Sequence, residues 1–305
     1  MSGGDEKAAV EASTSVEPFV LEYEVRGFDC GYGGPLRPLS LANFLQEAAG
    51  AHASALGIGM GELFARGHTW MLSRIDMRID RLPKEGDRVR VVTRPSGIER
   101  LFALRDLVLE DEAGRAFVRA VYAYLVVDIE ARRPLRPERA LPAAPLGSPL
   151  HCIEDLAFGA AAIAVSTRPA MDVVTASSAG AAYRLVARSR HIDHNGHVNN
   201  AHIIDWLVDA ALGSSDSKAS GSASSGAGLG AEGFASVRSL KVDFVQEILE
   251  GEEIEASAGP SAVATIAAST RAGASAEQVS DAPVAISAAL TRAGSIAAKV
   301  ELGFR

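Results

Sequence analysis

The chain has 305 residues, of which 48% are apolar and 22% are charged. This composition supports a packed core and excludes global disorder, and the length suggests about two domains. The 38 acidic residues exceed the 30 basic ones, and the net charge is −8. Such a charge disfavours nucleic acid as the main partner, because binding to phosphates requires a basic surface. No apolar run reaches the about 18 residues of a membrane-spanning helix, so no membrane span is expected.

The N-terminal stretch, MSGGDEKAAVEASTSVEP, is small and acidic. It lacks the basic start and apolar middle of a secretion signal, and it lacks the arginines of a transit peptide. We expect residues 1–17 to form a disordered tail and the protein to be cytoplasmic. The two cysteines, Cys30 and Cys152, are too few for a disulfide framework and have no metal-type spacing.

The first half, residues 18–140, is predicted to contain one strand, one long helix and four further strands. FVLEYEVRG alternates like a strand. SLANFLQEAAGAHASALG then has helical periodicity, with Ser40 as the predicted cap and Gly57 as the predicted stop. The four strand-like runs that follow are WMLSRIDMRIDRL, RVRVVTRPSG, LFALRDLVLED and FVRAVYAYLVVDI.

The second half, residues 181–305, repeats this order after a predicted connector over residues 141–180. AAYRLVARSR predicts a strand, HIDHNGHVNN a polar loop and AHIIDWLVDAAL a helix. Gly/Ser/Ala-rich residues 213–233 are expected to be a flexible insertion. When the halves are laid over each other, Gly86 falls on Gly251. The remaining predicted strands are SVRSLKVDFVQEI, EEIEASAG, AVATIAAST, APVAISAALT and AAKVELGF.

This repetition indicates a duplicated domain rather than a solenoid. Its fold class is α+β, with a long helix wrapped by an antiparallel sheet in each half, which is the element order of a double hotdog. That step is an analogy, and element order does not give a function.

The polar loop HIDHNGHVNN has three candidate explanations. Asn199 or Asn200 can cap the following helix, but a cap needs only one such residue. His191, His194 and His197 recur at every third position. Zinc sites more often pair histidines at helical spacing or with cysteines, so neither a metal nor another cofactor is expected.

The third explanation is a reaction centre at the start of a helix. Backbone N–H groups there are unpaired and can stabilise a developing oxyanion. Gly196 lets the backbone approach a substrate closely, and a histidine such as His197 can transfer protons. The Asn195 amide can hold a carbonyl group or a water molecule, and Asp193 can orient both neighbours.

DHNGHVNN, with Trp206 six residues further on, resembles the D-x-N-x-H-V-N-N motif of acyl-ACP thioesterases, the plant and bacterial enzymes that end fatty-acid synthesis. HTWMLSRIDMRIDRLPKEGD resembles the family's W-x-L-x-R and P-x-x-G-D segments. The resemblance extends over roughly residues 19–305. It implies a tandem hotdog fold and hydrolysis of fatty acyl-ACP, with an acyl carrier protein as partner. The implied catalytic residues are Asp193, Asn195, His197 and, after the next strand, Glu247.

Two positions depart from the family pattern. Ile248 stands where some plant members carry a cysteine, so a cysteine nucleophile is not expected. Ile203 replaces a common tyrosine. The first half has CGYGGPLRP in place of the catalytic loop, which predicts one site per chain with the first half lending pocket walls. The predicted acyl-chain contacts are Phe44, Met60, Trp70 and Leu72.

The mechanistic hypothesis is attack by a water molecule, with Glu247 and His197 as the acid–base pair and direct attack by a carboxylate as the alternative. Hotdog hydratases carry D-x-N-P-x-H, whose histidine lies one residue further from the aspartate than His197 does, and the loop has no proline, so dehydration is disfavoured. Two other functions remain open, an acyl-CoA thioesterase and a non-catalytic acyl-binding module. A homodimer also remains open. The arginines of IEARRPLRPERA, which could meet an acidic partner or form a solvated loop, are Arg132, Arg133, Arg136 and Arg139.

Overall fold

A computed structural model describes residues 16–141, 183–213, 233–260 and 285–304 of the chain. Several predictions fall outside these residues and keep their status as predictions. They concern most of the N-terminal tail, the connector and the Gly/Ser/Ala insertion, together with the strand AVATIAAST and the environment of Cys152. The predicted domain boundaries also stay predictions.

The first half contains the predicted strand, helix and four strands in the predicted order. Two short helices and a short strand, which the sequence analysis did not predict, are added to them. The elements are β1 (Phe19–Glu24), α1 (Pro38–Ala55), α2 (Met60–Phe64), β2 (His68–Ile79), β3 (Arg88–Glu99), β4 (Phe102–Asp111), β5 (Ala116–Asp128), β6 (Arg133–Leu135) and α3 (Pro137–Ala140).

The second half repeats the arrangement with one long helix. The loop that carries the polar motif precedes this helix, as the sequence predicts. The elements are β7 (Tyr183–Val186), α4 (Asn200–Gly213), β8 (Val237–Phe244), β9 (Glu253–Pro260), β10 (Ala285–Arg292) and β11 (Ser295–Phe304).

All strands belong to one continuous sheet. Its order is β1-β3-β4-β5-β2-β8-β11-β10-β9-β7, with β6 paired to β5. The order within the second half matches that of the first, strand for strand, so the two halves meet where β2 pairs with β8. At this seam Arg74 Nε lies 3.2 Å from Asp243 Oδ1, and Lys241 Nζ lies 3.8 Å from Asp76 Oδ2. The duplicated α+β hotdog architecture is thereby confirmed.

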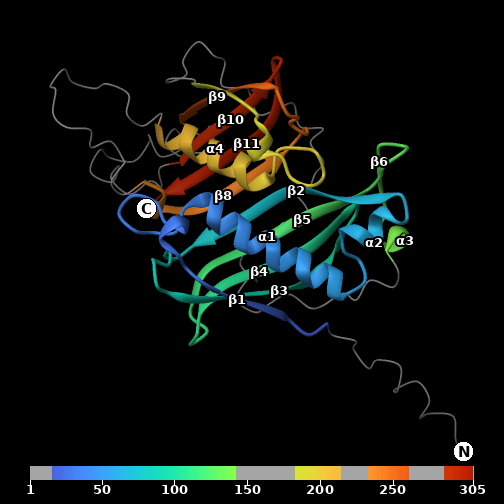
Figure 1. The fold of residues 1–305 in the computed structure, drawn as a ribbon, viewed down its shortest axis with the longest axis horizontal. Coiled ribbons are helices and arrows are strands. Elements are labelled where there is room, and N and C mark those ends of the chain that lie inside the picture. Colours follow the sequence, from blue (N-terminus) through green and yellow to red (C-terminus); the bar gives the residue numbers. More distant parts are fainter. Residues whose placement is uncertain (1–15, 142–182, 214–232, 261–284, 305) are drawn as a thin grey trace, which may run out of the picture.

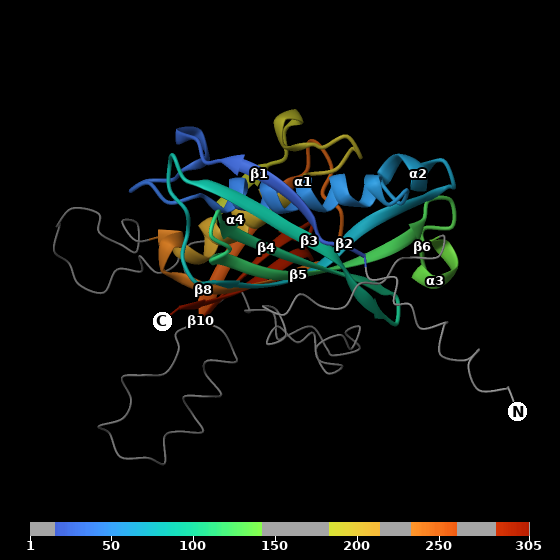
Figure 2. The ribbon, with the colours of Figure 1, turned by 90° about the horizontal axis from the view of Figure 1, so that it is seen from below.

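The two long helices lie on the same side of the sheet and pack against each other (Figures 1 and 2). Leu45 of α1 and Leu207 of α4 are fully buried in one shared core cluster. Apolar residues recur along one face of each helix, and that face packs against the strands. The other face of α1 carries exposed residues, whereas in α4 only Asp209 and Gly213 are exposed. The halves therefore share a single core.

Hydrogen bonds confirm the predicted superposition of Gly86 on Gly251. The Gly86 N–H donates to Val25 O, and the Gly251 N–H donates to Ala187 O, both at 2.9 Å. The two glycines have φ values of 85° and 84°, in the left-handed region that glycine adopts without strain. The same turn therefore closes the equivalent corner of both halves.

The first helix begins earlier than predicted. Its N-cap is Arg37 and Pro38 occupies the first turn, whereas Ser40 is buried inside the helix. Proline fits this position because its missing N–H would have no helical partner there. The predicted cap at Ser40 is therefore wrong. The predicted stop is confirmed, because the helix ends at Ala55 and Gly57 follows with φ 70°.

Candidate active site

The polar loop folds into a tight turn that its own aspartate organises. The Asp193 N–H donates to His197 O at 2.9 Å, and the Gly196 N–H donates to Asp193 O at 3.0 Å. Gly196 has a φ of 86°, which explains the glycine there. Asp193 Oδ1 accepts the Asn195 N–H at 2.8 Å, and Oδ2 lies 3.4 Å from Asn195 Nδ2. Asp193 thus holds Asn195 in place, as the sequence analysis expects.

The turn is fixed at both ends by main-chain hydrogen bonds. The Asn199 N–H donates to His191 O at 2.9 Å, and the Val198 N–H donates to Ile248 O at 2.8 Å. Asn199 Oδ1 accepts the Ala201 N–H at 2.9 Å, so the predicted cap of α4 is confirmed at Asn199. The bond to Ile248 brings the loop against the segment that follows β8.

This contact brings His197 and Glu247 together. His197 Nε2 lies 3.4 Å from Glu247 Oε1, and the two side chains are 33% and 38% exposed. They are therefore within reach of each other and of a substrate, as a proton-transferring pair must be.

Two arginines that the sequence analysis did not assign to the site surround Glu247. Arg132 Nη2, at the turn after β5, lies 3.8 Å from Glu247 Oε2. Arg292 Nη1 donates to Glu247 O at 2.8 Å and to Glu252 Oε2 at 3.0 Å. Arg132 belongs to the first half and Arg292 to the last strands, so no sequence spacing links either to the loop. Of these three residues, only Glu247 could be assigned to the site from the sequence.

The loop histidines do not converge. His191 is buried, its Nδ1 accepts the Arg188 N–H at 3.0 Å, and its ring lies edge-on to that of Trp206 with centroids 5.0 Å apart. Burial, followed by the nearby charges, lowers the pKa of His191. His191 therefore has a structural role, and His194 is exposed. Within the described ranges, no three His, Cys, Asp or Glu groups are arranged to hold a metal ion.

Three cavities meet at this loop. The inner cavity, of about 510 Å³, lies between α1 and the beginning of the loop. The outer cavity, of about 540 Å³, contains His197, Glu247 and both arginines in its wall. The narrow cavity, of about 120 Å³, shares Asn195 with both of the others.

The three cavities share lining residues along the beginning of β2, and together we call them the passage. Trp70 and Leu72 line the inner cavity, Thr69 and Met71 line the outer one, and all four line the narrow one. Because successive side chains of a strand point to opposite faces, the inner and outer cavities lie on opposite faces of β2. The passage exists because β8 pairs with β2 only over Arg74–Arg78.

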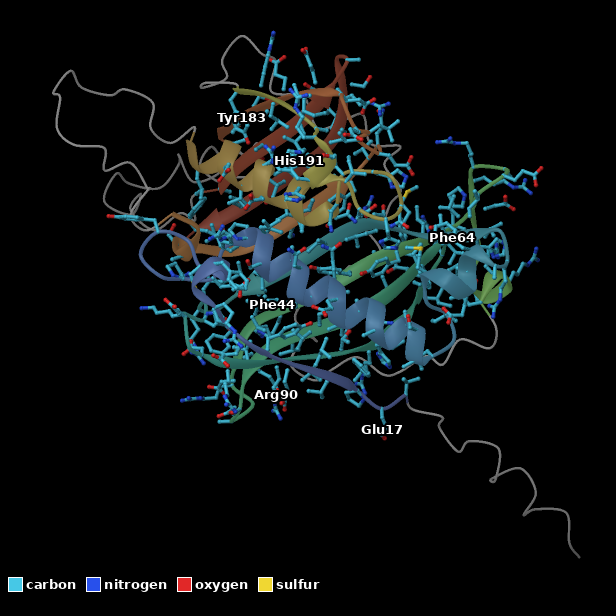
Figure 3. The ribbon with its side chains drawn as sticks, viewed as in Figure 1. Glu17, Phe44, Phe64, Arg90, Tyr183 and His191 are labelled. Atoms are coloured by element: carbon cyan, nitrogen blue, oxygen red, sulfur yellow. The ribbon has the colours of Figure 1, made fainter. Side chains whose placement is uncertain are left out.

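Three of the four predicted acyl-chain contacts line the inner cavity. They are Met60, Trp70 and Leu72. Phe44 does not line any of the three cavities. It is labelled on α1 in Figure 3 and is buried in the core. Its ring stacks on that of Tyr23, with the centroids 4.3 Å apart.

One wall of the inner cavity contains a buried cation. Arg105 is 6% exposed, and its Nη1 lies 3.0 Å from His52 Nδ1 and 3.3 Å from Thr93 Oγ1. Burial and the Arg105 charge lower the pKa of His52 to about 4. His52 is therefore neutral at neutral pH and can accept the Arg105 N–H.

Asn195 presents a polar atom to the passage. Its Oδ1 is buried and has no hydrogen-bond partner within the described residues, whereas its backbone N–H and side-chain amide both face Asp193. A buried carbonyl oxygen of this kind can accept a hydrogen bond from a small molecule in the passage. Asn200, the first residue of α4, also lines the inner and narrow cavities, so the positive end of the helix dipole faces them.

The fold and the loop place the molecule in the class of tandem hotdog proteins. Solved structures support the fold. An acyl-ACP thioesterase from Bacteroides thetaiotaomicron is 20% identical with a TM-score of 0.66, over 94% of this chain and 98% of that one. The 12:0-ACP thioesterase from Umbellularia californica is 18% identical with a TM-score of 0.66, over 94% of each chain.

Sequence comparisons show similarity to one family. Residues 17–140 match the model of the acyl-ACP thioesterase N-terminal domain. The chloroplastic palmitoyl-acyl carrier protein thioesterase of Gossypium hirsutum is 26% identical over 202 residues, which are 63% of this chain and 47% of that one. The match thus spans about half the length of that curated relative. The chain is therefore similar to acyl-ACP thioesterases, and the match to the family model covers residues 17–140. No helix in the described ranges is long and apolar enough to cross a membrane.

Proposed function

We propose that the chain hydrolyses the thioester of a fatty acyl chain carried by an acyl carrier protein and releases the free fatty acid. The observation that carries the proposal is the His197–Glu247 pair, 3.4 Å apart, beside a passage that runs from an exposed mouth to the inner cavity. The match of residues 17–140 to the family model and the names of the relatives support the same reaction class and carrier.

In the proposed reaction a water molecule attacks the thioester carbonyl carbon. The pair of Glu247 and His197 removes its proton, and the Asn195 side chain orients the water or the carbonyl group. The negative charge that develops on the carbonyl oxygen is stabilised at the N-terminal end of α4. The carbon–sulfur bond then breaks, and the departing thiolate takes up a proton from the pair. The acyl chain would lie in the inner cavity.

The test is a turnover assay with the purified chain and a ladder of acyl-ACPs and acyl-CoAs of increasing chain length. We expect equal amounts of free thiol and free fatty acid from acyl-ACP, with Glu247→Gln slower by on the order of 10²-fold or more. Binding of acyl-ACP without thiol release would overturn hydrolysis in favour of a binding module. Thiol release from acyl-CoA alone would overturn the proposed carrier, and formation of a double bond without thiol release would indicate a hydratase.

A further inference from the structure

Exposed apolar side chains gather at the mouth of the outer cavity. Seven large apolar residues are exposed in the described part of the chain, and three of them line this cavity. Phe64 is 44% exposed, Ile129 43% and Leu249 44%. Figure 3 shows Phe64 at the end of the molecule that carries α2. Single exposed apolar residues are ordinary, but a group around a cavity marks a surface that meets a partner.

Exposed arginines border this apolar group. Arg132 lines the outer cavity, and Arg133 pairs in the sheet with Asp128, which also lines it. The chain then continues into α3, whose Ala140 shares a small core with Leu63 of α2, so α3 and α2 lie at the same end of the molecule (Figure 1). The exposed arginines of this stretch are Arg132, Arg133, Arg136 and Arg139.

The carboxylates at the mouth are engaged within the protein. Asp128 Oδ1 accepts the Ala131 N–H at 2.8 Å. Glu247 contacts His197, and Glu252 Oε2 accepts the Leu249 N–H at 2.8 Å. Glu130 and Glu138 are also exposed on this stretch. The region nevertheless contrasts with the whole chain, in which 38 acidic residues outnumber 30 basic ones.

The order of the cavities indicates which part of the substrate lies at the mouth of the outer cavity. Three of the four predicted acyl-chain contacts line the inner cavity, and the proposed reacting pair lies in the wall of the outer cavity. A thioester placed at His197 with its acyl chain inward must leave its carrier arm in the outer cavity. The carrier itself then rests on the surface around Phe64, Ile129 and Leu249.

We propose that this surface, with Phe64, Ile129 and Leu249 at its centre and the four arginines of residues 132–139 at its rim, is the docking site of an acidic carrier protein. The inference rests on the proposed function and adds the face on which the carrier binds. An apolar centre with a charged rim is the usual arrangement of a protein interface. Rim charges that oppose those of the partner mainly accelerate association.

The test compares two substrates with the same acyl chain. One is acyl-ACP, and the other is acyl-pantetheine, which has the arm without the protein. In the double variant Arg133→Glu plus Arg136→Glu, we expect kcat/KM for acyl-ACP to fall by on the order of tenfold or more, because rim charges set the association rate. The value for acyl-pantetheine should stay within about twofold.

The control is a double variant with the same change in charge far from the mouth. Arg184 on β7 and Arg26 beyond β1 have side chains that are 78% and 58% exposed, at opposite edges of the sheet. Arg26→Glu plus Arg184→Glu should leave kcat/KM for both substrates unchanged. Added salt should also slow the wild type on acyl-ACP more than the rim variant, because salt screens exposed charges.

Several results would overturn the docking site. They are an unchanged rate on acyl-ACP, an equal loss on both substrates, or an equal loss in the control. A wild-type dimer that the rim variant converts to a monomer would assign this surface to a second copy of the chain. The affinity for acyl-ACP, measured by surface plasmon resonance, separates the two proposals. If the wild type binds without turnover and the rim variant loses binding, the docking site stands and the proposed hydrolysis fails.

Discussion

The loop before α1 and the loop before α4 share the same pattern of backbone hydrogen bonds. In each, a tight turn is closed by two hydrogen bonds and anchored by a third to the segment after β2 or β8. The bonds of the first loop are Gly31 N–H to Pro35 O (2.8 Å), Gly34 N–H to Gly31 O (3.1 Å) and Leu36 N–H to Pro83 O (2.9 Å). Those of the second are Asp193 N–H to His197 O (2.9 Å), Gly196 N–H to Asp193 O (3.0 Å) and Val198 N–H to Ile248 O (2.8 Å).

The side chains on these two frames are entirely different. In the first half, the counterparts of Asp193, Asn195, His197 and Glu247 are Gly31, Gly33, Pro35 and Leu82. None of these four can transfer a proton or orient a polar group through its side chain. The turn is therefore a folding device that both halves use to enter the long helix. The candidate catalytic side chains stand on one copy of it only, which shows why a fold alone does not give a function.

The largest expected effect breaks the equivalence of the two loops. His197→Gln should reduce thioester hydrolysis by on the order of 10²-fold or more, because it removes one partner of the proposed acid–base pair. Pro35→Ala, at the matching position of the first loop, should leave turnover unchanged. Steady-state kinetics on acyl-ACP measure both. Equal losses would mean that the variants act through stability, and no loss in His197→Gln would end its assignment.

The interiors of the two halves also differ in polarity, and this difference should appear in how the free energy of unfolding depends on pH. The first half buries His52 against Arg105, whereas at the position of Arg105 in the second half β10 carries the buried, apolar Ile286. The pKa of His52 is lowered to about 4 by burial and by Arg105, whereas in the unfolded chain it is about 6.5. Between these values the unfolded state binds more protons. The free energy of unfolding should therefore decrease as the pH falls from 6.5 to 4, by up to about 3 kcal/mol from this group.

Chemical denaturation at pH 7 and pH 5 measures this decrease. In His52→Gln, which keeps an acceptor for Arg105, the difference between the two pH values should shrink. His194→Gln changes an exposed histidine and is the control, with a difference like that of the wild type. If His52→Gln retains the full difference, other groups cause it.

Most of the framework could be predicted because periodicity is a local property. Alternation and helical spacing locate each long strand and both long helices, and the repeat of apolar positions aligns Gly86 with Gly251. Ser40 shows the limit. A serine next to an apolar run reads as a cap, but Pro38 starts the helix earlier and Ser40 is buried. The short elements α2, β6 and α3 have three to five residues, too few for a period to emerge.

In the candidate site, too, only the residues that lie close together in the sequence could be predicted as a group. Asp193, Asn195 and His197 lie within five residues, so a motif can reveal them together. Arg132 could not be assigned to Glu247, because their 3.8 Å contact joins the two halves across the sheet. Phe44 was predicted to contact the acyl chain, yet its ring stacks on that of Tyr23 in the core. Apolar character predicts burial, and only the tertiary structure distinguishes a core from a pocket.

A smaller effect, on stability, should be equal in the two loops. Gly34 and Gly196 have φ values of 96° and 86°, and a Cβ at either position would meet nothing within 4 Å. Gly34→Ala and Gly196→Ala should therefore each destabilise the protein by about 1–2 kcal/mol, the cost of a left-handed backbone with a side chain. Denaturant unfolding tests the equality. Turnover should fall in Gly196→Ala alone, because only that turn holds Asn195 and His197.

The smallest predicted effect concerns how the two helices begin. Asn199 caps α4 with its side chain, whereas the N-cap of α1, Arg37, makes no side-chain cap. Asn199→Ala should lower the free energy of unfolding by about 1 kcal/mol, because the Ala201 N–H loses its acceptor. Asn199→Asp restores an acceptor at the positive end of the helix and should recover most of this loss. If Asn199→Ala unfolds at the same denaturant concentration as the wild type, packing between α1 and α4 alone fixes the start of α4, and the cap contributes nothing to the difference between the halves.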